Sequence, residues 1–122
     1  MKNLFLLICF LMPLITFGQK ENDNYKMISD GLVRMLNQED YSGIYEMYSP
    51  VLRRFQNQDE SKKYLADIHN KYGQIKDCDF VQFQQNYGVY EATAEKGTFL
   101  IRISLDDQRR LVALNFYTEK IE

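Results

Sequence analysis

The sequence predicts an α+β domain in which helices come first and a four-stranded antiparallel sheet follows. Up to Gly73, apolar residues recur every three or four positions, which is typical of helices. After Gly73 they recur at every second position, which is typical of strands. Turn-forming residues divide this second half into four runs. A chain of 122 residues can bury one core, so we expect the helices to pack on one face of the sheet.

Residues 1–18 have the layout of a secretory signal peptide. Lys2 gives a basic start, an apolar run follows over residues 4–14, and Thr16-Phe17-Gly18 offers small residues before a cleavage site. The run is shorter than the roughly 20 apolar residues that span a bilayer. We therefore expect cleavage near Gly18-Gln19, export to the periplasm or the medium, and no stable membrane anchor afterwards.

Cleavage leaves a short polar segment over residues 19–24 and a single α+β domain over residues 25–122. The chain carries 15 Lys+Arg against 17 Asp+Glu, a balance that argues against nucleic acid as a partner. Only Cys78 remains after the signal peptide is removed, so an intramolecular disulfide is excluded.

The first helix is predicted from an apolar face formed by Met27/Ile28, Leu32, Met35 and Leu36. Gly31 lowers its intrinsic stability by about 1 kcal/mol relative to alanine, so this helix depends on tertiary contacts.

The second helix is expected to begin after Asp40, a favourable N-cap, and to end near Tyr48. Pro50 ends it, because proline lacks a backbone N–H and disfavours helix at the preceding residue. Its apolar face, here called the tyrosine stripe, consists of Tyr41, Ile44, Tyr45 and Tyr48.

The third helix is expected to start at Asn57 or Asp59, where Asn57 and Glu60 have the spacing of a capping box. It should end at Gly73, which can adopt the positive φ of a helix C-terminus. Its apolar positions are Tyr64, Leu65, Ile68 and Tyr72.

Four strands are predicted from alternating apolar residues. They cover residues 75–85, 90–94, 99–105 and 112–117, with turns expected at 86–88, 95–97 and 106–108.

Three pieces of the chain, DYSGIYEMYSPVLRRF, KYLADIHNKYGQIKD and GTFLIRISLDDQRRLVALNFY, together resemble a small secreted bacterial family of uncharacterised function. That family belongs to the nuclear transport factor 2-like (cystatin-like) superfamily, and its members occur alone or in front of serine hydrolase domains. The resemblance covers nearly all of residues 25–118. It implies a strongly bent, cone-shaped sheet around the helices, often with a cavity at the wide end, and frequent dimerisation through the exposed sheet face.

The tyrosine stripe should then pack into the concave side of the sheet, with each hydroxyl reaching a partner or water. Val51, Leu52 and Phe55 are expected to close the end of the cone. Candidates for lining a ligand cavity are Tyr41, Tyr45, Tyr48, Phe55, Tyr64 and Phe116.

Two arginine pairs could recognise anions, because guanidinium groups pair with carboxylate or phosphate. Arg53 and Arg54 are candidates for an anionic ligand or an acidic partner, although a solvated surface is the simpler interpretation. For Arg109-Arg110, local pairing with Asp106-Asp107 is a sufficient explanation.

No catalytic, metal-binding or cofactor-binding residues are predicted. Asp77 and Asp79 could share one face of a strand, but solvated carboxylates are the favoured interpretation. His69, the only histidine, is expected at the surface or boundary, and Cys78 is expected to be a buried apolar residue. The sequence has no cysteine–histidine metal spacing, glycine-rich phosphate loop or Gly-x-Ser-x-Gly motif.

These features favour a secreted, non-catalytic module. It would bind a small apolar or aromatic ligand in a tyrosine-lined cavity, or a protein partner through its sheet, which includes a homodimer. The alternative is a small isomerase- or cyclase-like enzyme with Tyr45 or Tyr48 as hydrogen-bond donor and an unidentified carboxylate as base. In a pure interaction protein, the tyrosine stripe would be core.

Overall fold

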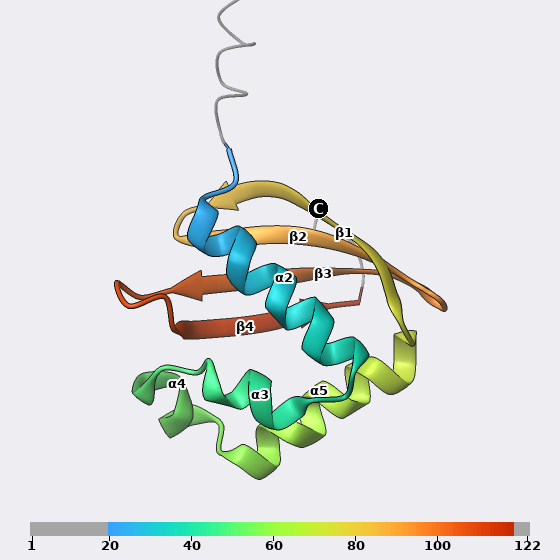
Figure 1. Ribbon diagram of the computed structural model, residues 1–122, viewed down its shortest axis with the longest axis horizontal. Helices are drawn as coiled ribbons and strands as arrows, with labels where there is room; N and C mark the ends of the chain where they lie inside the picture. Colours follow the sequence, from blue (N-terminus) through green and yellow to red (C-terminus); the bar gives the residue numbers. More distant parts are fainter. Residues whose placement is uncertain (1–19, 119–122) are drawn as a thin grey trace, which may run out of the picture.

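The computed structural model describes residues 20–118 and confirms the predicted fold class (Figure 1). Helices occupy the first half and a four-stranded antiparallel sheet the second. The elements are α2 (Asp23–Asn37), α3 (Tyr41–Glu46), α4 (Pro50–Phe55), α5 (Gln58–Tyr72), β1 (Ile75–Gln84), β2 (Tyr87–Ala94), β3 (Gly97–Leu105) and β4 (Leu111–Tyr117). The predicted signal peptide lies outside the described residues.

Helix α2 is capped by Asn22, whose side chain accepts the backbone N–H of Asn24 at 2.8 Å. Leu32 and Leu36 from its apolar face are buried in the core. The expected contribution of Met27 is wrong, because its side chain is exposed and the half-buried Ile28 packs on the core instead.

Helix α3 begins after Asp40, as predicted, and the Asp40 carboxylate accepts the backbone N–H of Gly43 at 3.0 Å. It ends at Glu46, before the expected end at Tyr48. Pro50 stops this helix and also starts the next one, because a missing N–H costs nothing in the first helical turn. Ser49 caps α4 by accepting the N–H of Leu52 at 3.1 Å.

Helix α5 confirms the capping box. The Glu60 carboxylate accepts the Asn57 N–H, and the Asn57 side chain accepts the Glu60 N–H, each at 2.9 Å. Gly73 ends the helix with a φ of 78°, as expected from its position.

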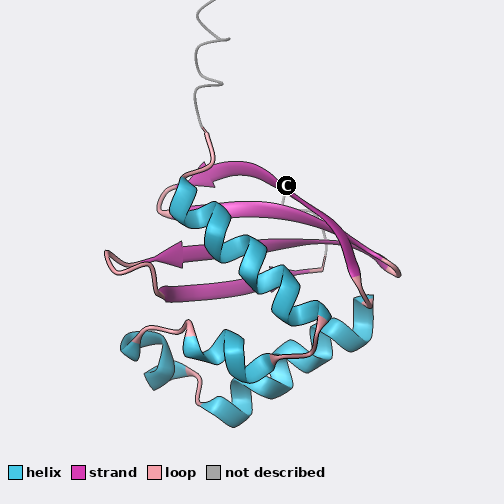
Figure 2. Ribbon diagram, in the orientation of Figure 1, coloured by secondary structure: helices cyan, strands magenta, loops and turns pink. Residues whose placement is uncertain are grey.

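The sheet is a meander in the order β1-β2-β3-β4 (Figure 2). The helices cover one face, here called the inner face, and the opposite face is called the outer face. Buried inner-face side chains are Tyr90, Ala92, Phe99, Ile101, Ile103, Leu114 and Phe116. Register shifts interrupt β1 between Ile75 and Asp77 and between Phe80 and Gln82. The strand curves visibly across the helices.

The first hairpin differs from the prediction, because Tyr87 and Gly88 already belong to β2. The chain turns at Gln85 and Asn86, and Gln85 takes a φ of 61°. Asn86 and Gly88 are both turn-forming residue types, but Gly88 is needed in the strand, where the ring of Tyr25 leaves no room for a side chain.

Two hydrogen-bonded seams join the helical layer to the sheet. At β1, the Asn37 side chain accepts the Ile75 N–H at 2.8 Å and donates to the Ile75 carbonyl at 3.0 Å. At β4, Leu111 donates its N–H to Met47 at 2.8 Å and accepts the N–H of Ser49 at 2.7 Å. The helices are therefore fixed at both lateral edges of the sheet.

We expect Gly73→Ala to destabilise the domain by about 1 kcal/mol or more, because a side chain at positive φ is strained. Its Cβ would also lie within contact distance of the Glu95 carboxylate, which accepts the Gln74 N–H. Gly31→Ala is the matched control. The nearest atom to its Cβ is 3.7 Å away, and the change should stabilise α2 by up to about 1 kcal/mol. Urea unfolding of both variants measures this, and equal effects of the same sign would contradict it.

Candidate functional site

The tyrosine stripe faces the core, as predicted. Ile44 and Tyr48 are fully buried, and Tyr41 and Tyr45 are half-buried and pack against the same cluster. The rings of Tyr45 and Tyr48 lie 5.2 Å apart in a tilted arrangement. The stripe therefore anchors the short helix α3 to the rest of the domain.

The hydroxyl of Tyr48 is satisfied inside the protein. It donates to the side-chain oxygen of Gln56 at 2.7 Å and accepts the hydroxyl of the fully buried Ser61 at 3.0 Å. Burial raises the pKa of Tyr48, and the hydrogen bond from Ser61 offsets only part of this rise. The hydroxyl stays neutral and already holds two partners.

Tyr64 and Phe116, two further cavity candidates, contact one another across the interface of α5 and β4. Their ring centroids are 5.3 Å apart, and the Tyr64 hydroxyl accepts the backbone N–H of Phe116 at 3.0 Å. Burial raises the pKa of Tyr64 as well. Both side chains fasten the helical layer to the last strand.

The expectation that Val51 and Phe55 close the end of a cone is wrong. Phe55 is 80% exposed and Val51 48% exposed. The two residues are one turn apart and share a side of α4, whereas Leu52 lies on a different side and packs on the core. A helix of six residues can pack only one face against the core, and in α4 this is the face that carries Leu52.

Arg53 and Arg54 do not act as a pair. The Arg53 guanidinium lies 4.8 Å from the ring centroid of Tyr45 and donates to the carbonyls of Tyr45 and Glu46 at 3.2 and 3.3 Å. It thus satisfies carbonyl groups at the end of α3. Arg54 is exposed.

In the second arginine pair, Arg110 shows the expected local charge pairing, with Asp106. Arg110 donates from Nε to the Asp106 carboxylate at 3.0 Å. The other oxygen of Asp106 accepts the backbone N–H groups of Gln108 and Arg110, both at 2.9 Å. These bonds, that from the Arg110 backbone above all, hold the pKa of Asp106 below its usual value. This cluster stabilises the β3–β4 hairpin.

The remaining sequence candidates do not come together. Asp77 and Asp79 are exposed on β1. His69 is mostly buried on α5, with Nε2 3.8 Å from the Glu39 carboxylate. Burial raises the pKa of the Cys78 thiol to about 12, so the thiol is neutral and a poor nucleophile.

One tyrosine–carboxylate pair was not predicted. The inner-face residue Tyr90, 1% exposed, donates its hydroxyl to the Glu21 carboxylate at 2.8 Å. Burial and the neighbouring negative charge raise the pKa of Tyr90 well above its usual value. The two residues are 69 positions apart, and the polar segment around Glu21 has no periodicity that would have indicated the contact.

A second unpredicted cluster lies on the outer face. The Arg102 guanidinium lies 4.2 Å from the ring centroid of Tyr87 and 5.6 Å from that of Tyr117. Its Nη1 donates to the Tyr117 hydroxyl at 2.9 Å. Its buried Nε has no hydrogen-bond partner among residues 20–118. The alternation of apolar residues in β3 could have indicated that Arg102 faces away from the helices, but the cross-strand register that adds the two tyrosines was not predictable from sequence.

Among residues 20–118, no three histidine, cysteine, aspartate or glutamate side chains are grouped so as to hold a metal ion. Within the same range, no helix is long and apolar enough to cross a membrane.

The model of one protein family matches residues 29–114, more than half of the chain, and its description is "Protein of unknown function (DUF3887)". The match runs from within α2 into β4 and so includes both seams. No curated protein matches the chain.

We expect Tyr48→Phe to destabilise the domain by about 1–3 kcal/mol, because the buried Ser61 hydroxyl loses its partner. Tyr45→Phe is the control. The described residues provide no hydrogen bond to the Tyr45 hydroxyl, so the change should stay within about 0.5 kcal/mol. Urea unfolding of the two variants decides this. Equal stabilities would mean that the Tyr48 hydroxyl contributes nothing.

We expect Asp106→Asn to lower the melting temperature at neutral pH and to have less effect in acid. The folded pKa of Asp106 is depressed, so its contribution is complete above the unfolded pKa of roughly 3.9 and is lost as the pH falls through the lower folded value. The side-chain oxygen of asparagine can still accept the backbone N–H groups of Gln108 and Arg110. The substitution therefore tests the effect of the negative charge alone. Melting curves from pH 7 to pH 2 measure the difference. The exposed Asp107→Asn is the control, and a pH-independent difference would contradict the assignment.

Proposed function

The chain belongs to the protein family of unknown function DUF3887, and we propose that it is an exported, non-catalytic module that binds a partner protein through the outer face of its sheet. The observation that carries this proposal is that the described helices pack on the opposite face and leave the tyrosine- and arginine-bearing outer face uncovered. The other groups that sequence reasoning singled out are bonded within the domain, packed in its core or exposed without forming a catalytic arrangement.

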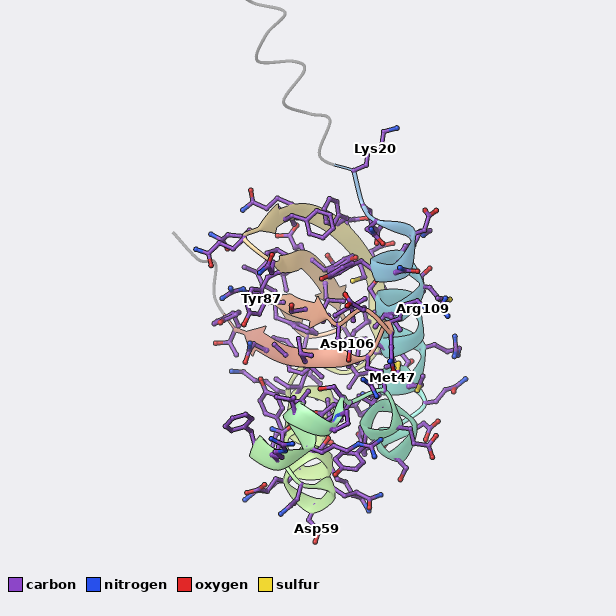
Figure 3. All side chains as sticks on the ribbon, turned by 90° about the vertical axis from the view of Figure 1, so that its left-hand side faces the viewer. Lys20, Met47, Asp59, Tyr87, Asp106 and Arg109 are labelled. Atoms are coloured by element: carbon purple, nitrogen blue, oxygen red, sulfur yellow. The ribbon has the colours of Figure 1, made fainter. Side chains whose placement is uncertain are left out.

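The helices all pack on the inner face, and in Figure 3 Tyr87 points to the side of the sheet opposite α2. Five outer-face residues from three strands form what we call the outer patch: Tyr87, Val89, Leu100, Arg102 and Tyr117. The register places Val89 opposite Arg102, and Leu100 opposite Tyr117. No described helix covers this patch.

The composition of the outer patch is that of a protein interface. Tyrosine and arginine are enriched at interfaces and among the residues that contribute most binding energy. Val89 is only 4% exposed although no described helix lies over it, so its neighbours on the face already form a closely packed surface. Such a surface gives a partner a defined shape and costs little conformational entropy on binding.

A small ligand bound among the tyrosines is less well supported. The Tyr48 hydroxyl is bonded to Gln56 and Ser61, and the Tyr64 hydroxyl is bonded to Phe116. A ligand would have to compete with these hydrogen bonds. A buried hydroxyl that already has its partners contributes little to orienting a bound ligand.

The enzymatic alternative has one observation in its favour, which is the pair formed by Tyr90 and Glu21. Isomerase-like chemistry needs a donor and a carboxylate that both reach the substrate. In this pair the hydroxyl donates to the carboxylate itself, so the donor is already used. The elevated pKa of Tyr90 also makes it a weak acid.

Two further parts of the proposal come from the sequence. The signal-peptide pattern of residues 1–18 supports export to the periplasm or the medium. The order of helices and strands, with the helices on one face of an antiparallel meander, supports membership of the nuclear transport factor 2-like superfamily.

Native mass spectrometry of the protein isolated from its own compartment tests the proposal. We expect a complex with a second protein chain that Leu100→Glu, which puts a charge into the outer patch, abolishes. Met27→Glu is the matched control, because Met27 is 51% exposed on α2, and it should retain the complex. A small-molecule adduct kept by both variants, or a lone monomer throughout, would overturn the proposal.

A further inference from the structure

Arg102, at the centre of the outer patch, has no ion-pair partner among the residues that the structure describes. It sits on β3, opposite Val89 of β2 and Asn115 of β4, so neither direct cross-strand neighbour carries a charge. Glu91, opposite the adjacent outer-face residue Leu100, is the nearest acid by register. The ion pairs recorded within residues 20–118 do not include Arg102.

The neighbouring tyrosines hold the guanidinium in one orientation. Tyr87 and Tyr117 flank Arg102 diagonally from the two adjacent strands, and both rings lie within cation–π distance. The Tyr117 hydroxyl fixes one end through its bond to Nη1. An arginine oriented in this way loses less side-chain entropy when it binds a ligand than a freely moving one.

The guanidinium still has hydrogen-bonding capacity. Of its five N–H groups, one is used by Tyr117, and the buried Nε–H has no partner among the described residues. A buried donor without a partner costs free energy, which a fitting acceptor recovers. The acceptor that matches a guanidinium in both charge and planar shape is a carboxylate, which can take two parallel hydrogen bonds.

We propose that Arg102 receives a carboxylate, from an aspartate or glutamate side chain of the partner protein, between the rings of Tyr87 and Tyr117. This rests on the proposed function and names the chemistry of its central contact. Asp77, Asp79 and Glu91 line the β1 side of the same face and would repel acidic groups of the partner. The partner's surface is therefore not acidic throughout. It carries an isolated carboxylate with basic groups on the side that meets β1.

The geometry favours a different chain over a second copy. In a two-fold interface, residues at the centre of the face meet their own symmetry mates. Arg102 lies on an inner strand of the sheet, so such an interface would bring two arginine cations together.

The carboxylate chemistry is tested with a probe pair, N-acetylglutamate amide and N-acetylglutamine amide, which differ in charge but hardly in shape. Titration of the folded protein, followed by the NMR signal of the Arg102 Nε–H, should give a shift with the glutamate probe only. The shift should weaken at high salt. Arg54→Gln, which removes an exposed arginine on α4, is the control and should retain it. No shift, or the same shift with both probes, overturns the carboxylate assignment.

The source of the carboxylate is tested with Arg102→Lys in the protein complex. A carbodiimide joins an amine to a carboxylate in direct contact, so mass spectrometry should find position 102 linked to an aspartate or glutamate of the partner. Arg54→Lys should give no such link. A link to Asp77, Asp79 or Glu91 of a second copy overturns the assignment to a different chain.

Affinity separates this inference from the proposed function. Arg102→Gln should weaken the complex by about tenfold or more, and Arg102→Lys should recover part of the loss. If Leu100→Glu abolishes the complex but Arg102→Gln leaves it unchanged, the function stands and the carboxylate contact is wrong. If no protein complex forms while the glutamate probe still shifts the Nε–H signal, the carboxylate site stands and the partner protein is wrong.

Discussion

The structure depends on the pairing of Asn37 with the backbone of Ile75. One amide side chain, at the end of α2, satisfies both the N–H and the carbonyl of the first residue of β1, as a neighbouring strand would. The carbonyl of Asn37 also accepts the side-chain amide of Gln74. The end of the first long helix and the start of the sheet are thereby fixed to one another, although Asn37 and Ile75 are 38 positions apart in the chain.

The second seam has a different origin, because it consists of main chain alone. Leu111 joins the segment between α3 and α4 through the backbone of Met47 and Ser49. Within that segment, Ser49 is extended because Pro50 disfavours helix at the residue before it, so the proline makes this part of the seam available. Between the two seams, Leu32, Leu36, Ile44 and Leu65 fill the space against the inner face. The tyrosine stripe completes this packing, and its Tyr48 hydroxyl adds internal hydrogen bonds to Gln56 and Ser61.

The fold was predictable from local signals, and the candidate sites were predictable only in part. The capping box of α5, Asp40 before α3 and the positive φ of Gly73 each follow from residues close together in sequence. Phe55 was misjudged because hydrophobicity says nothing about which side of a six-residue helix turns inward. The outer patch depends on the register between β2, β3 and β4. One residue of slip would remove Arg102 from between its tyrosines.

The interruptions in β1 have a consequence for how the protein behaves among other chains. An outermost strand exposes backbone donors and acceptors that can recruit another strand and start aggregation. The shift between Phe80 and Gln82 breaks that row and leaves Val81 turned outward, 51% exposed. On the opposite edge, the bridge between Tyr48 and Leu111 occupies part of β4. Neither edge strand therefore presents a continuous row of backbone donors and acceptors to another chain. This favours specific contacts through side chains over aggregation through added strands.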